Sequence, residues 1–214
     1  MKLKQATLAA IIALCVILLT KTLATLFPVE FGQQNVARVT ITLTALAGLA
    51  VAHFYYRFYR DYTRADQRGL RRVSLLAAVA AAAMAVLYIK GFLIVYDLSV
   101  IDILERMRFL DAIVPWLATA IYLEFFIVLW GEVKNRENSR LKNAVRLALI
   151  GSVVMIAERT LMLYSYHQFS AFDRTAGLPE SVYTAAIPFI LFAAGSVLYF
   201  FVVFYGELRP VSTH

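Results

Sequence analysis

Charged side chains are scarce in this chain of 214 residues, because Asp, Glu, Lys and Arg together make up only 16% of it. A soluble globular domain carries about 25% charged residues and about 45–50% apolar ones. Here hydrophobic residues reach 61%, and the mean hydropathy is +0.71. This balance excludes an intrinsically disordered protein and argues against an ordinary water-soluble fold. It predicts a membrane protein built from α-helices.

Cysteine and histidine are also rare. Cys15 is the single cysteine, which excludes a disulfide framework or a cysteine-based metal site within one chain. The three histidines, at positions 53, 167 and 214, have no ligand-like spacing, so neither a metal nor another cofactor is expected. The net charge of +7 indicates basic loops beside a membrane rather than a surface for nucleic acid.

Six apolar segments are each long enough to cross a hydrocarbon core of about 30 Å as a helix. They cover residues 6–28, 38–57, 73–96, 111–132, 144–166 and 181–206. The sequence therefore predicts an all-α polytopic membrane protein, with residues 1–214 forming one transmembrane domain of six bundled helices and no soluble domain. The first segment follows two lysines, as a signal peptide would, but no clear small-residue cleavage site follows it, so a true span is predicted.

Basic residues gather on one side of the predicted membrane. With the N-terminus inside, the inner segments hold 14 of the 21 lysines and arginines. Such an excess is typical of cytoplasmic loops. We therefore expect both termini inside, in a bacterial-type cytoplasmic (inner) membrane.

Pairs of basic residues 19 positions apart recur every 69 residues, and they are Lys2 with Lys21, Arg71 with Lys90, and Arg140 with Arg159. This period favours three related helical hairpins. The second residue of each pair lies near the predicted outer face. Lys21, Lys90 and Arg159 would either snorkel separately to headgroups or converge on a site for an anion, a lipid headgroup or a partner's carboxylate. Glu158, next to Arg159, would neutralise part of that charge.

Two ionisable residues interrupt the apolar segments nearer the inner face. His53 lies four residues before Arg57, and Glu124 lies eight residues before Glu132. Because an ionisable group inside a bilayer is costly, the two are predicted to pair. The pair would relay a proton or bind a ligand, or would form one structural hydrogen bond between helices.

Two features lie outside the predicted spans. The arginines of residues 57–72 recur at helical spacing, which predicts one basic helical face that projects into the cytoplasm and turns near Gly69; these are Arg57, Arg60, Arg64, Arg68 and Arg71. This face would contact anionic lipid or an acidic partner, or would only set the topology. The segment 97–111 is amphipathic and is predicted to be a short helix on the outer surface.

Aromatic and small residues suggest how the helices are placed. The aromatic run 54–59 is interpreted as part of an interfacial belt, in which the aromatic rings contact lipid and the tyrosine hydroxyls contact water. The alanine-rich run 77–85 permits close helix contact, so its helix is expected near the centre of the bundle.

The sequence contains no nucleophile elbow, no HExxH zinc motif, no P-loop and no dinucleotide-binding glycine motif. We therefore expect a non-enzymatic membrane protein that acts by binding, as a sensor, a scaffold, or a subunit of a complex or homo-oligomer. The alternatives are a small channel or transporter, for an anion at the outer basic layer or for protons at His53 and Glu124, and, with less support, a lipid-modifying enzyme.

Overall fold

The computed structural model describes residues 2–26, 34–96, 108–135, 137–172 and 180–208. These residues form helices α1 (Lys2–Leu26), α3 (Gln34–Arg57), α4 (Arg68–Tyr96), α6 (Arg108–Val133), α7 (Ser139–Phe172) and α8 (Glu180–Glu207). A short π-helix, η1 (Phe58–Tyr62), continues α3. No β-strand occurs in the ranges just given. The prediction of an all-α protein is confirmed.

Five helical stretches within the described ranges are long and apolar enough to cross a membrane, which indicates a membrane protein, and they are Lys2–Thr20, Arg38–Tyr62, Arg68–Lys90, Leu110–Val133 and Pro188–Glu207. Their outward surfaces carry large apolar side chains, among them Ile12, Val79 and Val202. Helix α7, which covers the fifth predicted span (144–166), is not among these five stretches. It carries the adjacent charges Glu158 and Arg159 inside its apolar stretch.

Polar side chains inside these apolar helices are satisfied by their own backbone. The hydroxyls of Thr44, Ser74 and Ser152 each donate to the carbonyl oxygen four residues earlier, at 2.6–2.8 Å. This local bond lets a small polar residue lie in an apolar environment without an unpaired donor.

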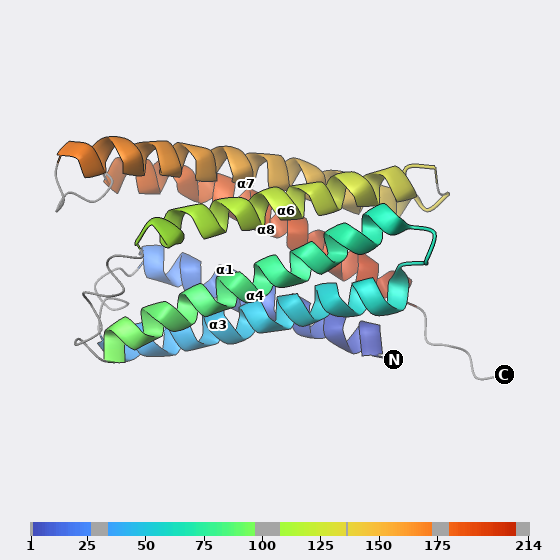
Figure 1. The fold of residues 1–214 in the computed structure, drawn as a ribbon, viewed down its shortest axis with the longest axis horizontal. Helices are drawn as coiled ribbons and strands as arrows, with labels where there is room; N and C mark the ends of the chain where they lie inside the picture. Colours follow the sequence, from blue (N-terminus) through green and yellow to red (C-terminus); the bar gives the residue numbers. More distant parts are fainter. Residues whose placement is uncertain (1, 27–33, 97–107, 136, 173–179, 209–214) are drawn as a thin grey trace.

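The helices lie side by side along the long axis of the molecule, and each runs opposite to the one before it (Figure 1). Each helix contacts the next one in the chain, and α8 also contacts α1, so the contacts close into a ring. We call the end where α1 begins and α8 ends the basic end, and the opposite one the far end. The helix with the alanine-rich run, α4, was expected near the centre of the bundle. It does not lie there, because its residues Val79 and Val86 are exposed.

Two glycines mark where neighbouring helices approach most closely. A Cβ added at Gly48 of α3 would lie 3.1 Å from the Cβ of Ala85 on α4. A Cβ added at Gly151 of α7 would lie 2.8 Å from the Cβ of Ser196 on α8. Small residues therefore allow the backbones of these pairs to come together.

An aromatic cluster fills the ring towards its basic end. Its members are buried phenylalanines from three helices and η1, namely Phe54, Phe58, Phe125, Phe126, Phe200, Phe201 and Phe204. Ring centroids lie 4.5 Å apart for Phe54 and Phe201, and 5.2 Å apart for Phe126 and Phe200. The belt interpretation of run 54–59 is therefore wrong for Phe54, Tyr55 and Phe58, since these side chains point into the protein and not towards an interface.

The predicted basic helical face is also wrong, because the helix ends within the run of arginines, at Tyr62. Helix α3 passes into η1, and the amide of Thr63 donates to the carbonyl of Phe58, five residues earlier, at 3.2 Å. Residues 63–67 then form a turn, so Arg64 lies in a loop while Arg68 and Arg71 belong to α4. Gln67 Nε2 anchors this turn by donating to Glu132 Oε2 of α6 at 2.7 Å.

Residues 97–107, most of the predicted amphipathic outer helix, lie outside the described part of the chain. At the end of α3, Arg57 Nη1 lies 4.0 Å from Oδ2 of Asp61 in η1.

Candidate functional site

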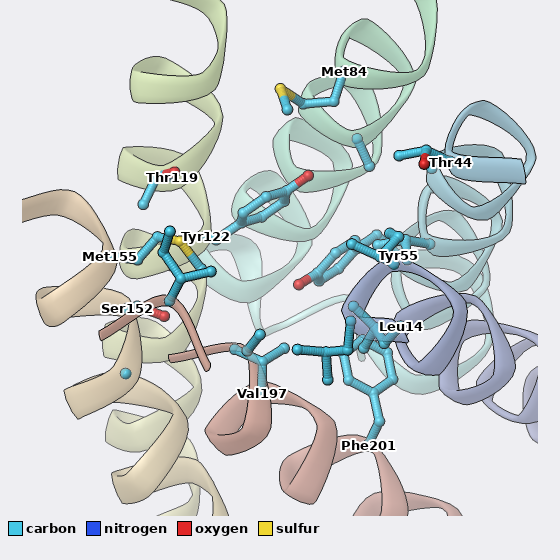
Figure 2. Close-up of a pocket in the computed structure, with 18 of the residues that line it drawn as sticks. Leu14, Thr44, Tyr55, Met84, Thr119, Tyr122, Ser152, Met155, Val197 and Phe201 are labelled. Atoms are coloured by element: carbon cyan, nitrogen blue, oxygen red, sulfur yellow. The ribbon is translucent and has the colours of Figure 1, made fainter. Parts of the chain in front are cut away.

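All six helices contribute to one cavity inside the ring, with a volume of about 200 Å³. Its walls are mostly apolar and include Leu14, Val51, Met84, Met155 and Val197. Figure 2 shows Leu14, Met84, Met155 and Val197 around a common space. The aromatic cluster forms its floor, since Phe126 and Phe201 belong to both. The cavity therefore lies between the aromatic cluster and the far end.

Tyrosines supply hydroxyl groups to this apolar space. Tyr55 of α3 and Tyr122 of α6 are stacked, with ring centroids 5.6 Å apart and ring planes at 12°. Both hydroxyls point into the cavity (Figure 2). A third tyrosine, Tyr88 of α4, lines the same wall. Neither the Tyr55 nor the Tyr122 hydroxyl bonds to any residue that the structure describes, so both are available to a ligand.

The remaining cavity hydroxyls are already engaged as donors. Thr44, Thr119 and Ser152 each donate to a carbonyl oxygen of their own helix. Their oxygens still have lone pairs, but their hydrogens are committed. The tyrosines therefore carry the free hydroxyl donors of the described cavity wall.

Arg159 brings a positive charge to the cavity wall. Its Nε lies 3.3 Å from Oε2 of Glu158, the adjacent residue of α7, and the Glu158 side chain is 7% exposed. The two charges therefore compensate each other next to the cavity. The contact is an ion pair and not a hydrogen bond, since neither Arg159 Nε nor Glu158 Oε2 has a hydrogen-bond partner among the described residues, so the guanidinium N–H groups remain available to a ligand.

Lys90, a second member of the predicted outer basic layer, has a different partner. Its Nζ lies 2.8 Å from both carboxylate oxygens of Asp111, and this ion pair joins α4 to α6. Lys90 does not line the cavity. The side chain of Lys21 lies outside the described part. The structure thus holds Lys90 and Arg159 in separate ion pairs and does not bring them to one site.

His53 and Glu124 are both exposed on the outer surface of the ring. The reason is helix geometry, since residues two apart on a helix point in different directions. Tyr55 and Tyr122 face each other inside the ring, so His53 and Glu124, two positions away, face outward. The structure does not bring them together as a pair.

The basic end holds the remaining predicted contact residues. Arg60, Arg64 and Arg68 are exposed, while Arg71 donates to the Tyr59 hydroxyl at 3.2 Å and lies over the Tyr59 ring. This part of the surface is basic, but its arginines come from η1, a turn and α4 rather than from one helix. Among the described residues, no group of three or more His, Cys, Asp or Glu side chains could hold a metal ion.

Sequence reasoning missed the tyrosines at the centre of the site. Tyr55 was assigned to an interface, and Tyr122 was not singled out. There was little sign of this pair in the sequence, because Tyr55 lies two residues from the inner end of its predicted span and Tyr122 lies ten residues from the inner end of its own. What the sequence lacked was the direction in which each side chain points.

Comparison with protein-family models, with curated proteins and with solved structures finds no match to this chain. The fold and the site therefore define its class: in its described residues, an all-helical protein with five helical stretches long and apolar enough to cross a membrane and an internal cavity lined in part by hydroxyl donors.

Proposed function

We propose that this protein is a non-enzymatic membrane protein that binds a small, mainly apolar molecule in its central cavity. In this proposal it works as a sensor, a scaffold, or a subunit of a larger or homo-oligomeric assembly. The observation that carries the proposal is that residues from all six helices line one largely apolar cavity. A ligand bound there would contact every helix and would therefore favour one arrangement of the ring.

The proposal includes a topology of six membrane spans, in which α7 crosses the membrane in addition to the five apolar stretches given above. Both termini lie on the cytoplasmic side of a bacterial-type inner membrane, and the basic end faces the anionic lipid or acidic partner. Helices α1 and α3, α4 and α6, and α7 and α8 form the three related hairpins. Supporting observations are the length of α7, its contacts with α6 and α8, and the mutual compensation of its charges Glu158 and Arg159.

The rival function is a channel or transporter, which needs a continuous polar path. The aromatic cluster speaks against such a path, because phenylalanines at most 2% exposed fill the basic end of the described ring. His53 and Glu124 speak against a proton path through the ring, because they lie on its outer surface. Binding fits these observations better than conduction does.

A matched pair of valine substitutions on α8 tests the proposal. Val197 lines the cavity, whereas Val202 is 49% exposed on the outer surface. Val197→Phe adds bulk to the cavity, and we expect it to abolish co-purification of an apolar molecule. Val202→Phe adds the same bulk facing lipid and should leave co-purification unchanged.

Native mass spectrometry of gently extracted protein, followed by solvent extraction, would measure the bound molecule in both variants and in the unchanged protein. Thermal melting in the same detergent controls for folding. Equal ligand occupancy in folded Val197→Phe and unchanged protein would contradict binding in the cavity.

A further inference from the structure

The hydrogens of the cavity wall that lack an acceptor belong to two tyrosines and an arginine. Tyr55 and Tyr122 each offer a hydroxyl hydrogen, and Arg159 offers guanidinium N–H groups. No Asp or Glu occurs among the described residues that line the cavity. A donor kept in apolar surroundings without an acceptor is costly. The molecule that fits this cavity therefore carries acceptor oxygens.

The cavity is elongated along the helices. On α3 its lining extends from Thr44 to Tyr55, and on α8 from Ile190 to Phe201. At about 1.5 Å per residue, each stretch is about 16 Å long. The volume of about 200 Å³ exceeds the roughly 150 Å³ of an engineered apolar cavity that binds benzene. One ring and part of a chain fit this shape better than a bulky, compact molecule does.

The aromatic floor favours a planar group. Tyr55 and Tyr122 are stacked, and Tyr55 also meets the Phe125 ring edge-on, with centroids 5.0 Å apart. Phe126 and Phe201 line the same end of the cavity. Flat rings pack well against such surfaces in offset or edge-on geometry.

The charge balance favours a neutral ligand over an anion. The Arg159 charge is compensated by Glu158, whose Oε2 lies 3.3 Å from Arg159 Nε. An anion added beside this pair would leave one negative charge without a partner in surroundings of low dielectric constant, which is costly. A neutral carbonyl oxygen accepts hydrogen bonds without adding charge.

From these four observations we propose that the central cavity binds a lipid-soluble quinone, a neutral planar ring with carbonyl oxygens and an apolar chain. The hydroxyls of Tyr55 and Tyr122 donate to a ring carbonyl, and the chain runs along the apolar wall. This inference rests on the proposed binding function and adds the chemical class of the ligand.

Titration of the purified full chain in detergent with decylubiquinone tests the ligand class. Tyr122→Phe and Tyr55→Phe each remove one hydroxyl and keep the ring. We expect each variant to weaken binding about 3- to 10-fold, the range that corresponds to one hydrogen bond, and the double variant to weaken it further. Tyr56→Phe removes an exposed hydroxyl of the same helix, so its affinity should stay within about 2-fold of the unchanged protein.

Two analogues separate this inference from the function on which it rests. Decylbenzene has the ring and chain but no carbonyl, and decanoate has an anionic head. We expect both to bind more weakly than decylubiquinone and to be insensitive to the tyrosine variants. If decylbenzene or decanoate binds as tightly, or if the double variant binds the quinone normally, the quinone inference is overturned while binding in the cavity stands.

If none of the three molecules binds, or if Val197→Phe leaves their binding unchanged, both the inference and the proposed function fail. Thermal melting of each variant in the same detergent establishes that a loss of affinity is not a loss of fold.

Discussion

At the scale of single residues, the Lys90–Asp111 ion pair shows how a charge is placed near the end of a membrane-spanning helix. Lys90 lies in the last two turns of α4 and Asp111 in the first turn of α6. The antiparallel arrangement of α4 and α6 brings them to one level, at 2.8 Å. The Lys90 side chain is only 13% exposed, so the pair offsets part of the cost of burying its ammonium group.

A double-mutant cycle tests the energy of this pair. Lys90→Gln and Asp111→Asn should each lower the free energy of unfolding, and the double variant should lose less than the sum of the two. We expect a coupling energy of about 0.5–1 kcal/mol, because Asp111 is half exposed and solvent weakens the attraction. Unfolding in mixed detergent gives the four free energies. Strict additivity would mean that the two side chains do not interact.

Residue positions were predicted better than residue directions. The sequence identified His53, Glu124, Glu158 and Arg159 as polar groups inside apolar segments, and the structure places all four within helices. It did not reveal that His53 and Glu124 face outward while Tyr55 and Tyr122 face inward. Apolar side chains cover both the core and the lipid-facing surface, so the usual contrast between a polar and an apolar helix face is missing.

At the scale of helices, the contact of α7 with α8 depends on the absence of a side chain at Gly151. A methyl group there would lie 2.8 Å from the Cβ of Ser196 and 3.1 Å from the carbonyl oxygen of Ala193. Residues 193–196 are all small, and Ala193 and Ser196 are buried where α8 contacts α7. A run of small residues can be recognised from the sequence alone, because it permits close contact whichever side of the helix faces the neighbour.

Gly151→Ala tests this contact, and Gly195→Ala is its matched control. We expect Gly151→Ala to destabilise the protein by about 1–3 kcal/mol, because α7 and α8 must move apart. Nothing lies within 4 Å of a Cβ added at Gly195, so that change should be neutral or stabilising by up to about 1 kcal/mol through higher helix propensity. Thermal melting measures both. A Gly151→Ala variant as stable as Gly195→Ala would show that the helices are not in close contact here.

The end of α3 shows why a regular spacing can mislead. The arginines of run 57–71 recur at 3 and 4 positions, which is helical spacing, yet the helix ends within the run. Gln67 bonds to Glu132 of α6 at 2.7 Å, and the Thr63 hydroxyl donates to the Tyr59 carbonyl at 2.6 Å. These contacts, one of them between residues 65 positions apart, fix the turn. Spacing within the run contains no information about such a distant partner.

At the scale of the whole molecule, the ring explains why a cavity exists. If one helix lay at the centre, it would fill the space between the other five. Here each helix instead contacts its neighbours along the chain, and α8 contacts α1. Phenylalanines fill the ring at the basic end, and smaller or polar side chains leave space beyond them. Helix number and length could be predicted from sequence, whereas this order of contacts depends on which faces meet.

The ring also makes a prediction about topology that depends on α7. If α7 crosses the membrane, residues before its start and near its far end must be accessible from opposite sides. Asn135 precedes α7 at the basic end and Tyr164 lies towards the far end, and both are exposed. At about 1.5 Å per residue, Ser139 and Tyr164 are about 37 Å apart along the helix, which exceeds a hydrocarbon core of about 30 Å.

Cysteine labelling with a membrane-impermeant maleimide would measure this accessibility in sealed, oriented vesicles. The natural Cys15 is first replaced by serine, since it is exposed on α1. We expect Asn135→Cys and Ala65→Cys to be labelled from one side, because both lie in connections at the basic end, and Tyr164→Cys to be labelled from the other.

Labelling of positions 135 and 164 from the same side would mean that α7 does not cross. That result would place α7 at the membrane surface and would contradict its contacts with both α6 and α8 along the ring.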